Sequence, residues 1–268
     1  MIKVMVTGCL GRMGTRILNI VRETDGVSLA AGLEMKGHPK KGADIGTLNG
    51  LGEIGVPVSD DINDCIDACD VIIDFTSPEA SMQNISVAAE KGKAIVVGTT
   101  GLTDEQIAKV KDMSASVKCV LAPNMSVGVN LLYKVLNDIS PLLKDDYDIE
   151  IIEAHHRNKK DAPSGTAIKL AQVIADSVDR DLNKIGVYER HGIIGARTDE
   201  EIGIQTIRGG DIVGEHTVIF AGAGERIEIA HKATSRDNFA KGAVRAAKWI
   251  CAKENGLYDM MDVLGLKG

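Results

Sequence analysis

Residues 2–14 read IKVMVTGCLGRMG, and this stretch decides the predicted fold. Ile2 to Thr7 is an apolar run that is too short for the core of a helix, so we expect a buried strand. Three glycines follow with G-x-x-G-x-x-G spacing, which departs from the more usual G-x-G-x-x-G. A helical pattern then continues to Thr24. A strand, a glycine loop and a helix in this order can bind a pyrophosphate through backbone amides and the helix dipole.

An acidic residue stands at a suitable distance from this loop. Glu34 closes a second predicted strand, residues 27–33, and follows Gly14 by 20 positions. A carboxylate at this place accepts hydrogen bonds from the adenosine ribose hydroxyls of a dinucleotide. A glycine loop alone would also suit an ordinary strand-to-helix turn, but together with Glu34 it favours dinucleotide binding.

The residues around Glu34 bear on the choice between NADH and NADPH. A carboxylate repels a ribose 2′-phosphate, and the next residue is Met35 rather than an arginine that would bind this group. Lys36, Lys40 and Lys41 are still close enough in the sequence to reach a phosphate. NADH and NADPH therefore both stay open as cofactors, and the sequence favours NADH.

Strands and helices alternate through the first half of the chain. After the first two strands we expect three more, at residues 71–75, 94–97 and 117–121, and helices at 81–91 and 103–113. This alternation indicates β-α-β units and a parallel sheet. Residues 37–55 are rich in glycine, lysine and aspartate, lack periodicity, and are predicted to form an irregular surface loop.

The pattern changes after about residue 125. Helices are expected at residues 129–143 and 165–178 with a strand at 148–153 between them, followed by strands at 203–208, 215–220 and 226–231 and a helix at 236–253. Successive strands across glycine-rich turns indicate an antiparallel or mixed sheet.

The fold class that these patterns predict is α/β with two domains. A Rossmann-like parallel-sheet domain that binds a dinucleotide would comprise residues 1–126 and 236–268. An α+β domain with a mixed open sheet would comprise residues 127–235.

Charge and hydrophobicity argue against two classes of partner. Lys and Arg number 31 and Asp and Glu 38, which gives a net charge of −7, whereas proteins that bind nucleic acid are normally basic. No apolar run reaches the roughly 18 residues that a membrane span needs. The N-terminal apolar stretch passes into the glycine loop too soon for a signal peptide. Five scattered cysteines without a C-x-x-C pair indicate reduced thiols, so we expect a cytoplasmic protein.

A second informative stretch, residues 153–166, reads EAHHRNKKDAPSGT. It holds five potential cations in an acidic chain, which indicates an anionic ligand. It follows a predicted strand and enters a helix whose first amides, at Ser164 to Thr166, could bind a carboxylate. Histidine and lysine are also natural proton donors near neutral pH. One alternative is a solvated loop that ends at Ser164 as the N-cap of the helix, with one of the two histidines in a structural role. The other alternative is a metal site, but the stretch lacks ligands at supporting spacing.

Several strings along the chain match motifs of one enzyme family. They are VTGCLGRMG at residues 6–14, DFTSP at 74–78, VGTTG at 97–101, APNMSVGVN at 122–130, EAHHRNKKDAPSGTA at 153–167, DIVGEH at 211–216 and ATSR at 233–236. By these strings, over nearly its full length, the chain resembles the 4-hydroxy-tetrahydrodipicolinate reductase family, also called dihydrodipicolinate reductases, of lysine and diaminopimelate biosynthesis. The string at 153–167 is the longest and most specific.

The resemblance implies a site for each ligand. The implied cofactor site comprises Gly8, Cys9, Leu10, Gly11, Arg12, Met13, Glu34, Gly98, Thr99, Thr100, Ala122, Pro123, Asn124 and Met125. His155 and Lys159 are implied as the catalytic proton donors. His156, Gly165 and Thr166 would hold a cyclic dicarboxylate substrate. No metal is implied, and the family assembles as tetramers through the sheet of its second domain, so we expect a homotetramer.

Two positions depart from the family pattern. The family often has arginine where Met35 stands, which bears on NADPH affinity, and often phenylalanine where Met125 stands. Neither departure touches the chemistry.

The implied activity is the reduction of 4-hydroxy-tetrahydrodipicolinate to tetrahydrodipicolinate by NAD(P)H, with loss of water. Hydride would add to the unsaturated ring, and the resulting enamine carbon would then be protonated. Because cofactor and substrate would be held by different domains, we expect hinges near residues 124–130 and 235–240. The competing hypotheses are a non-catalytic sensor of NAD redox state, which would not need His155 and Lys159, and a reductase of another small substrate such as an amino-acid imine.

Overall fold

The strand predicted from the first residues lies inside a seven-stranded sheet. β1 (Ile2–Thr7) pairs with β2 (Val27–Leu33) on one side and with β4 (Val71–Asp74) on the other. The strand order is β12-β6-β5-β4-β1-β2-β3, and each pairing is parallel. The remaining strands are β3 (Val58–Ser59), β5 (Ala94–Val97), β6 (Lys118–Leu121) and β12 (Gly256–Tyr258). The predicted Rossmann-like parallel sheet is therefore confirmed.

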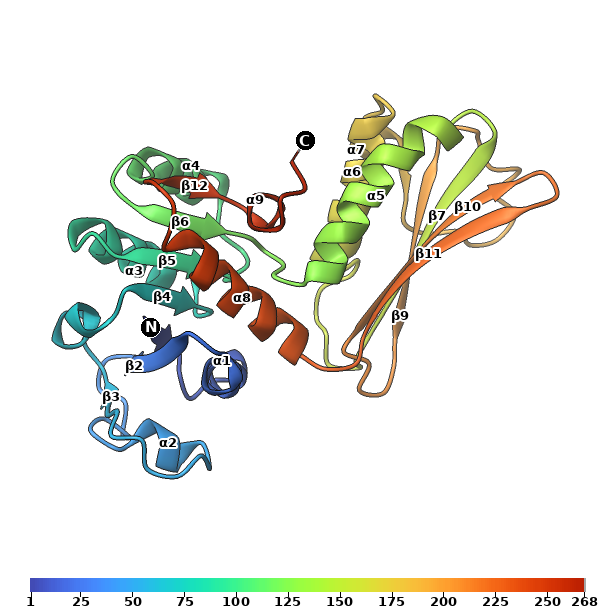
Figure 1. Ribbon diagram of the computed structural model, residues 1–268. Coiled ribbons are helices and arrows are strands. Elements are labelled where there is room, and N and C mark those ends of the chain that lie inside the picture. The colour runs from blue at the N-terminus through green and yellow to red at the C-terminus, as the bar shows by residue number, and fades with distance from the viewer. Residues whose placement is uncertain (268) are drawn as a thin grey trace. The chain divides into compact units, whose positions relative to one another are not determined.

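The computed structural model describes residues 1–267, and its ribbon is drawn in Figure 1. The chain divides into two units, which we call the first unit (residues 1–127 and the segment from Arg236 onward) and the second unit (Gly128–Ser235). The sheet just described belongs to the first unit. Because all carboxyl ends of its strands lie at one edge, the loops that follow β1, β2, β4, β5 and β6 gather there.

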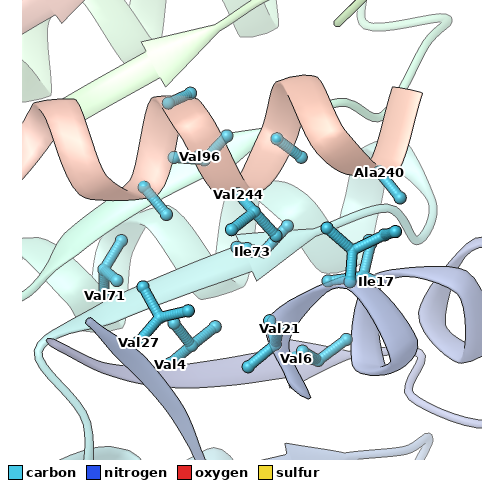
Figure 2. Packing of buried hydrophobic residues seen from close by; sticks show 14 of the residues in the cluster. Val4, Val6, Ile17, Val21, Val27, Val71, Ile73, Val96, Ala240 and Val244 are labelled. Carbon is cyan, nitrogen blue, oxygen red and sulfur yellow. The ribbon is translucent and has the colours of Figure 1, made fainter. Parts of the chain in front are cut away.

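Helices cover both faces of this sheet because its strands are apolar on both sides. In β4, Ile73 faces a cluster that includes α1 (Arg12–Glu23) and α8 (Asp237–Ile250), and Ile72 faces α3 (Pro78–Glu90) and α4 (Asp104–Met113). Figure 2 shows the first of these clusters, in which Val244 of α8 and Ile17 and Val21 of α1 join side chains of the strands, among them Val4 and Ile73. Each such fully buried aliphatic side chain stabilises the fold by roughly 1.5–3 kcal/mol.

Polar capping residues stabilise the first turns of α3 and α4. Ser77 caps α3, with Pro78 in the first turn, and Thr103 and Gln106 form a capping box at the start of α4. The C-terminal helix α8 returns to the first unit and packs closely on the chain after β6. A Cβ atom at Gly242 would lie 1.8 Å from the carbonyl oxygen of Met125, so this contact requires glycine.

The second unit is built on a five-stranded mixed sheet of order β11-β10-β7-β9-β8. β10 (Gly214–Gly222) is antiparallel to β7 (Tyr147–His155) and to β11 (Arg226–Ala233), whereas β9 (Ile202–Arg208) is parallel to β7 and to β8 (Gly186–Val187). α5 (Val127–Leu143) and α6 (Gly165–Ser177) pack on one face of this sheet, and α7 (Leu182–Ile185) follows α6. The predicted mixed sheet is confirmed.

Some expected elements differ from those observed. Residues 37–55 are not wholly irregular, because they contain the one-turn helix α2 (Ile45–Leu48) with Ile45 buried. Asp44 organises this segment: its carboxylate accepts hydrogen bonds from the amides of Thr47 (2.8 Å) and Val56 (3.1 Å). Elements that were not predicted are the short strands β3, β8 and β12, the helices α7 and α9 (Met260–Leu264), and the 3-10 turns η1 (Ile62–Asp64) and η2 (Ile66–Ala68). Within residues 1–267, no helix has the length and apolar character required to cross a membrane.

We predict that Gly14→Ala destabilises the first unit. A Cβ atom at Gly14 would lie 2.1 Å from the carbonyl oxygen of Gly8 and 2.7 Å from the Cα of Cys9, so the backbone would have to shift. Alanine is the better helix former, and any loss therefore reports this clash. We expect a loss of about 2 kcal/mol or more in the free energy of unfolding, measured by chemical denaturation. Thr15→Ala, on the same turn, is the control and should change stability little; equal stability of the two variants would contradict the prediction.

Candidate functional site

The glycine loop after β1 leaves the first amides of α1 available to a ligand. Gly8 has a φ of +60°, and its carbonyl oxygen accepts a hydrogen bond from the amide of Gly11 (2.9 Å). Gly11 caps α1 without a side-chain hydrogen bond, and no acidic residue lies in the first turn. The positive end of the helix dipole is therefore not neutralised by a side chain of the helix itself, which suits a phosphate.

The side chain of Cys9 points away from this binding surface. It is fully buried in the core of the first unit, and burial raises the pKa of its thiol to about 12. Cys9 can therefore contribute only its backbone to a ligand. Leu10 and Met13 also pack against this core, whereas Arg12 is exposed.

Glu34 reaches back to the glycine loop. Its Oε1 atom accepts a hydrogen bond of 2.7 Å from the amide of Leu10, so the carboxylate is fixed next to the loop. Glu34, Gly8 and Gly11 line one cleft of about 510 Å³ in the first unit, together with Met35, Lys36, Asp60, Asp61, Phe75 and Thr76. A carboxylate has two acceptor oxygens, so Glu34 can hold the loop and still accept from a ribose hydroxyl.

A buried carboxylate connects the loops that follow β1, β4 and β5. Asp74 is fully buried, and its Oδ1 atom accepts hydrogen bonds from the hydroxyls of Thr7 (2.8 Å) and Thr76 (2.6 Å). The hydroxyl oxygen of Thr99 accepts from the amide of Thr76 (2.9 Å) and from the hydroxyl of Ser81 (2.8 Å). This network fixes the two strings, DFTSP and VGTTG, against each other.

Residues 98–100 and 122–125 differ from one another in burial and in their contacts. Gly98 lies against the ring of Phe75, because a Cβ atom there would come within 2.2 Å of it. Thr100 and Pro123 are exposed, Ala122 is buried, and the side chain of Met125 belongs to the core. The oxygen of the Asn124 amide accepts a hydrogen bond from the amide of Ser126 (2.9 Å). These residues follow β5 and β6 at the carboxyl edge of the sheet, but they do not line the cleft that holds Glu34.

The central group of the second unit is the carboxylate of Glu153, near the end of β7. It is fully buried and accepts two hydrogen bonds of 2.8 Å from the guanidinium of Arg208. It also accepts from the amide of Ser164 (2.9 Å) and the hydroxyl of Thr206 (3.2 Å), and it lies 2.6 Å from Nδ1 of His155. One carboxylate thus connects β7, β9 and the start of α6.

Glu153 stays ionised at physiological pH. Burial alone would raise its pKa, but the hydrogen bonds from Arg208 and His155 outweigh burial and hold the pKa at about 2, below the ordinary value of 4.5. A carboxyl group whose pKa is lowered by folding stabilises the protein above its unfolded pKa. Its contribution is therefore complete above about pH 4.5 and is lost as the pH falls toward 2.

This arrangement determines which nitrogen of His155 can exchange a proton. An ionised carboxylate can only accept, so Nδ1 of His155 donates its proton to Glu153 and Nε2 is directed elsewhere. Burial lowers the pKa of His155 below its ordinary value, although Glu153 acts in the opposite direction. A Cβ atom at Gly214 would lie 3.1 Å from Nε2, so the glycine leaves room beside this atom.

A second histidine supports the first. Strand register places His216 of β10 opposite Glu153, and the rings of His216 and His155 meet edge to face with centroids 5.2 Å apart. Nε2 of His216 lies 3.0 Å from the hydroxyl oxygen of Ser164, which caps α6 and accepts from the amide of Ala167. Burial, followed by the proximity of His155, lowers the pKa of His216 to about 4, so His216 is neutral at physiological pH.

The loop between β7 and α6 carries the other predicted residues. The ammonium of Lys159 lies 3.0 Å from a carboxylate oxygen of Asp161. His156, which follows His155 directly, is half-buried. Gly165 is exposed at the first position of α6, and nothing lies within 4 Å of where its Cβ would be. Thr166 makes a hydrogen bond with Tyr133 of α5, whose pKa is raised by burial.

The structure therefore gathers His155, the start of α6 and the loop with Lys159 around Glu153. Functional roles were not predicted for Glu153, Arg208, Thr206, His216 or Asp74. Signals existed for two of them, since Glu153 opens the basic string and His216 ends the string DIVGEH. Arg208 gave no signal, because strand pairing alone brings it to Glu153. Within residues 1–267, no group of three His, Cys, Asp or Glu side chains could hold a metal ion.

Comparison with known proteins agrees with this organisation. The family models described as dihydrodipicolinate reductase, N-terminus and C-terminus, match residues 2–125 and 128–264. Proteins named 4-hydroxy-tetrahydrodipicolinate reductase from Geotalea daltonii and Geobacter sulfurreducens are 55% and 54% identical to this chain over 100% of both lengths. A solved structure, dipicolinate-bound dihydrodipicolinate reductase from Paenisporosarcina sp. TG-14, has a TM-score of 0.77 and 26% identity over 98% of each chain. The chain belongs to the dihydrodipicolinate reductase family.

Proposed function

We propose that this chain is an NAD(P)H-dependent oxidoreductase that reduces 4-hydroxy-tetrahydrodipicolinate to tetrahydrodipicolinate, with loss of water, in lysine and diaminopimelate biosynthesis. The observation that carries the proposal is the site around Glu153. There the family's basic string folds so that Glu153 binds both His155 and the amide of Ser164 at the start of α6, and Lys159 acts on the pKa of His155. The solved relative bound to dipicolinate, a ring dicarboxylate, supports the same substrate class for this chain.

The first unit would bind the cofactor. The amides of the glycine loop and of α1, residues 8–13, would hold the pyrophosphate, and Glu34 would accept from the adenosine ribose hydroxyls. Residues 98–100 and 122–125, at the same edge of the sheet, would contact the rest of the cofactor. The bound cofactor supplies hydride. Because Glu34 repels a 2′-phosphate and Met35, which is 73% exposed, cannot bind one, we propose NADH as the preferred cofactor.

The second unit would bind the substrate and deliver the proton. Carboxylates of the substrate would meet the first amides of α6 at Gly165 and Thr166, with His156 beside them. Nε2 of His155 would donate a proton to the ring carbon next to the reduced position. The ammonium of Lys159 would neutralise charge that develops on the ring and serve as a second proton donor.

The chain is proposed to act as a homotetramer in the cytoplasm. On the face of the second sheet opposite α5 and α6, Ile152, Ile207 and Ile219 alternate with core residues, and Ile207 is 51% exposed. Such a face suits pairing with another copy of the chain. All five cysteines are free thiols, as expected in a reducing compartment.

The experiment that tests the function follows NADH absorbance while the substrate forms by condensation of pyruvate and aspartate semialdehyde. We expect rapid oxidation that depends on both precursors, and slower oxidation with NADPH. Equal rates with an amino-acid imine in place of the condensation product would favour a reductase of another substrate. Binding of NADH without any oxidation would contradict the proposal and favour a redox sensor.

We predict that His155→Ala lowers kcat by roughly 10² to 10³ and leaves the Kd for NADH nearly unchanged. The variant removes the proposed proton donor, which lies in the second unit. It leaves the first unit, where NADH is proposed to bind, unaltered. Steady-state kinetics and fluorescence titration with NADH measure the two quantities. His191→Ala removes an exposed histidine and is the control, with unchanged kcat. Unaltered turnover of the His155 variant would remove this residue from the role.

We predict that Glu153→Gln shifts the pH dependence of kcat. His155 faces Glu153 on its own strand, Arg208 on β9, His216 on β10 and Lys159 on the following loop. Among these groups Glu153 raises the pKa of His155, so its neutralisation lowers that pKa further. The alkaline limb of kcat, which reports loss of the His155 proton, should move to lower pH by about one unit or more.

The pH profile is measured for variants whose folding has been checked by circular dichroism. Glu200→Gln, at an exposed position of the second unit, is the matched control and should keep the original profile. A Glu153 variant with lower kcat but an unshifted alkaline limb would show that the carboxylate acts only through structure. An alkaline limb that moves to higher pH would contradict the assigned direction.

Sedimentation velocity tests the proposed assembly. We expect one species with the mass of four chains, because the exposed apolar face of the second sheet would be covered in the tetramer. Ile207→Asp places a charge on this face and should produce smaller species. A protein that stays monomeric at concentrations used for the activity assay would contradict the tetramer.

A further inference from the structure

The segment that follows Glu34 is folded around a second carboxylate, that of Asp60. β2 and β3 bring the two regions together, since the amide of Glu34 donates to the carbonyl oxygen of Ser59 (2.8 Å). Oδ2 of Asp60 accepts from the amide of Gly37 (2.9 Å), and Oδ1 lies 2.5 Å from the ammonium of Lys41. The side chain of Asp60 is only 10% exposed, so both contacts fix it firmly.

Asp60 also forms part of the cleft that holds Glu34. The same cleft is lined by Met35, Lys36 and Asp61. Lys41 does not line the cleft. Its ammonium is in direct contact with the carboxylate of Asp60, which does line the cleft. The hydrogen bond from Lys41 lowers the pKa of Asp60, which therefore stays ionised when the enzyme works.

The charges at this end of the cleft repel the ribose 2′-phosphate that distinguishes NADPH from NADH. In the proposed function Glu34 marks the place of the adenosine ribose, so a 2′-phosphate would enter beside it. There it would meet the carboxylates of Glu34, Asp60 and Asp61. Two lysines could offset this charge, but Lys41 is paired with Asp60, and Lys36 lies near Asp61 and lowers its pKa, after the larger effect of Asn63.

We propose that Asp60 is a specificity residue that excludes NADPH, by placing a carboxylate next to the 2′ position and by occupying Lys41. The inference rests on the proposed cofactor site and goes beyond it, because it assigns the choice of cofactor to a residue outside the glycine loop and outside the Glu34–Met35 pair. It also explains why a lysine-rich segment need not favour NADPH. Of the three lysines between residues 36 and 41, Lys41 is paired with Asp60, and Lys36, which lines the cleft, lies near Asp61.

The decisive variant is Asp60→Asn. Its amide oxygen can still accept from Gly37, so the loop is held, while the negative charge is lost and Lys41 is released. Calorimetric titration of the protein with adenosine 2′,5′-bisphosphate and with 5′-AMP compares the two cofactor types without any catalysis. We expect the ratio of the two Kd values to shift about tenfold toward the bisphosphate. The ratio of kcat/KM for NADPH to that for NADH should rise by a similar factor.

Two further variants locate the effect. Asp60→Asn combined with Lys41→Met should lose most of the gain, because the released lysine supplies the attraction. Asp112→Asn removes a carboxylate from an exposed position on α4 and should leave both ratios unchanged. A double variant that keeps the full gain would overturn the part assigned to Lys41.

The test separates this inference from the function beneath it. Unchanged ratios in a folded Asp60→Asn protein, with normal binding of 5′-AMP, would overturn the role of Asp60 alone. An unaltered protein that binds neither nucleotide would overturn the proposed cofactor site and the inference with it.

Discussion

The buried carboxylate of Glu153 is the interaction on which the second unit depends. It accepts hydrogen bonds from Arg208, Thr206 and the amide of Ser164, and it holds the ring of His155. A buried charge is costly unless it is paired and fully hydrogen-bonded, and removing one partner of such a pair typically costs about 3–5 kcal/mol. Glu153 meets this requirement by drawing three segments together. The same bonds that stabilise the charge also orient His155 and fix the first turn of α6, so stability and proposed chemistry rest on one group.

Asp74 performs the corresponding task in the first unit. It is also fully buried, and its hydroxyl partners Thr7 and Thr76 come from the ends of two adjacent strands. Asp74 is the last residue of β4 and Glu153 lies near the end of β7, and the partners of each come from a neighbouring strand or from the segment that follows. Hydrogen bonds to these buried side chains therefore anchor one end of the loops that would bind cofactor and substrate, and the backbone amides of these loops stay available to anions.

The sequence predicted the parts of the fold that depend on local pattern. The apolar run at residues 2–7 and the glycines after it were sufficient for β1 and α1, and the basic string indicated a candidate site near residue 155. The residues around Glu153 could not be predicted from the sequence, because strand register determines them. Thr206 lies opposite Glu153 in the parallel pairing, and His216 lies opposite it in the antiparallel pairing. The strands β3, β8 and β12 are too short to show periodicity. The Asp60–Lys41 pair was likewise missed, since two residues 19 positions apart meet only after β2 and β3 have paired.

Glu153 is ionised and binds the Nδ1 proton of His155, which leaves Nε2 for the proposed proton transfer. Nuclear magnetic resonance of the protein with nitrogen-15 in its histidine rings tests this claim directly, with Glu153→Gln used to assign the signal. We expect neutral His155 to carry its proton on Nδ1, and its pKa to lie below the ordinary value and to fall further in the variant. A neutral ring with its proton on Nε2, or a pKa above the ordinary value, would contradict it.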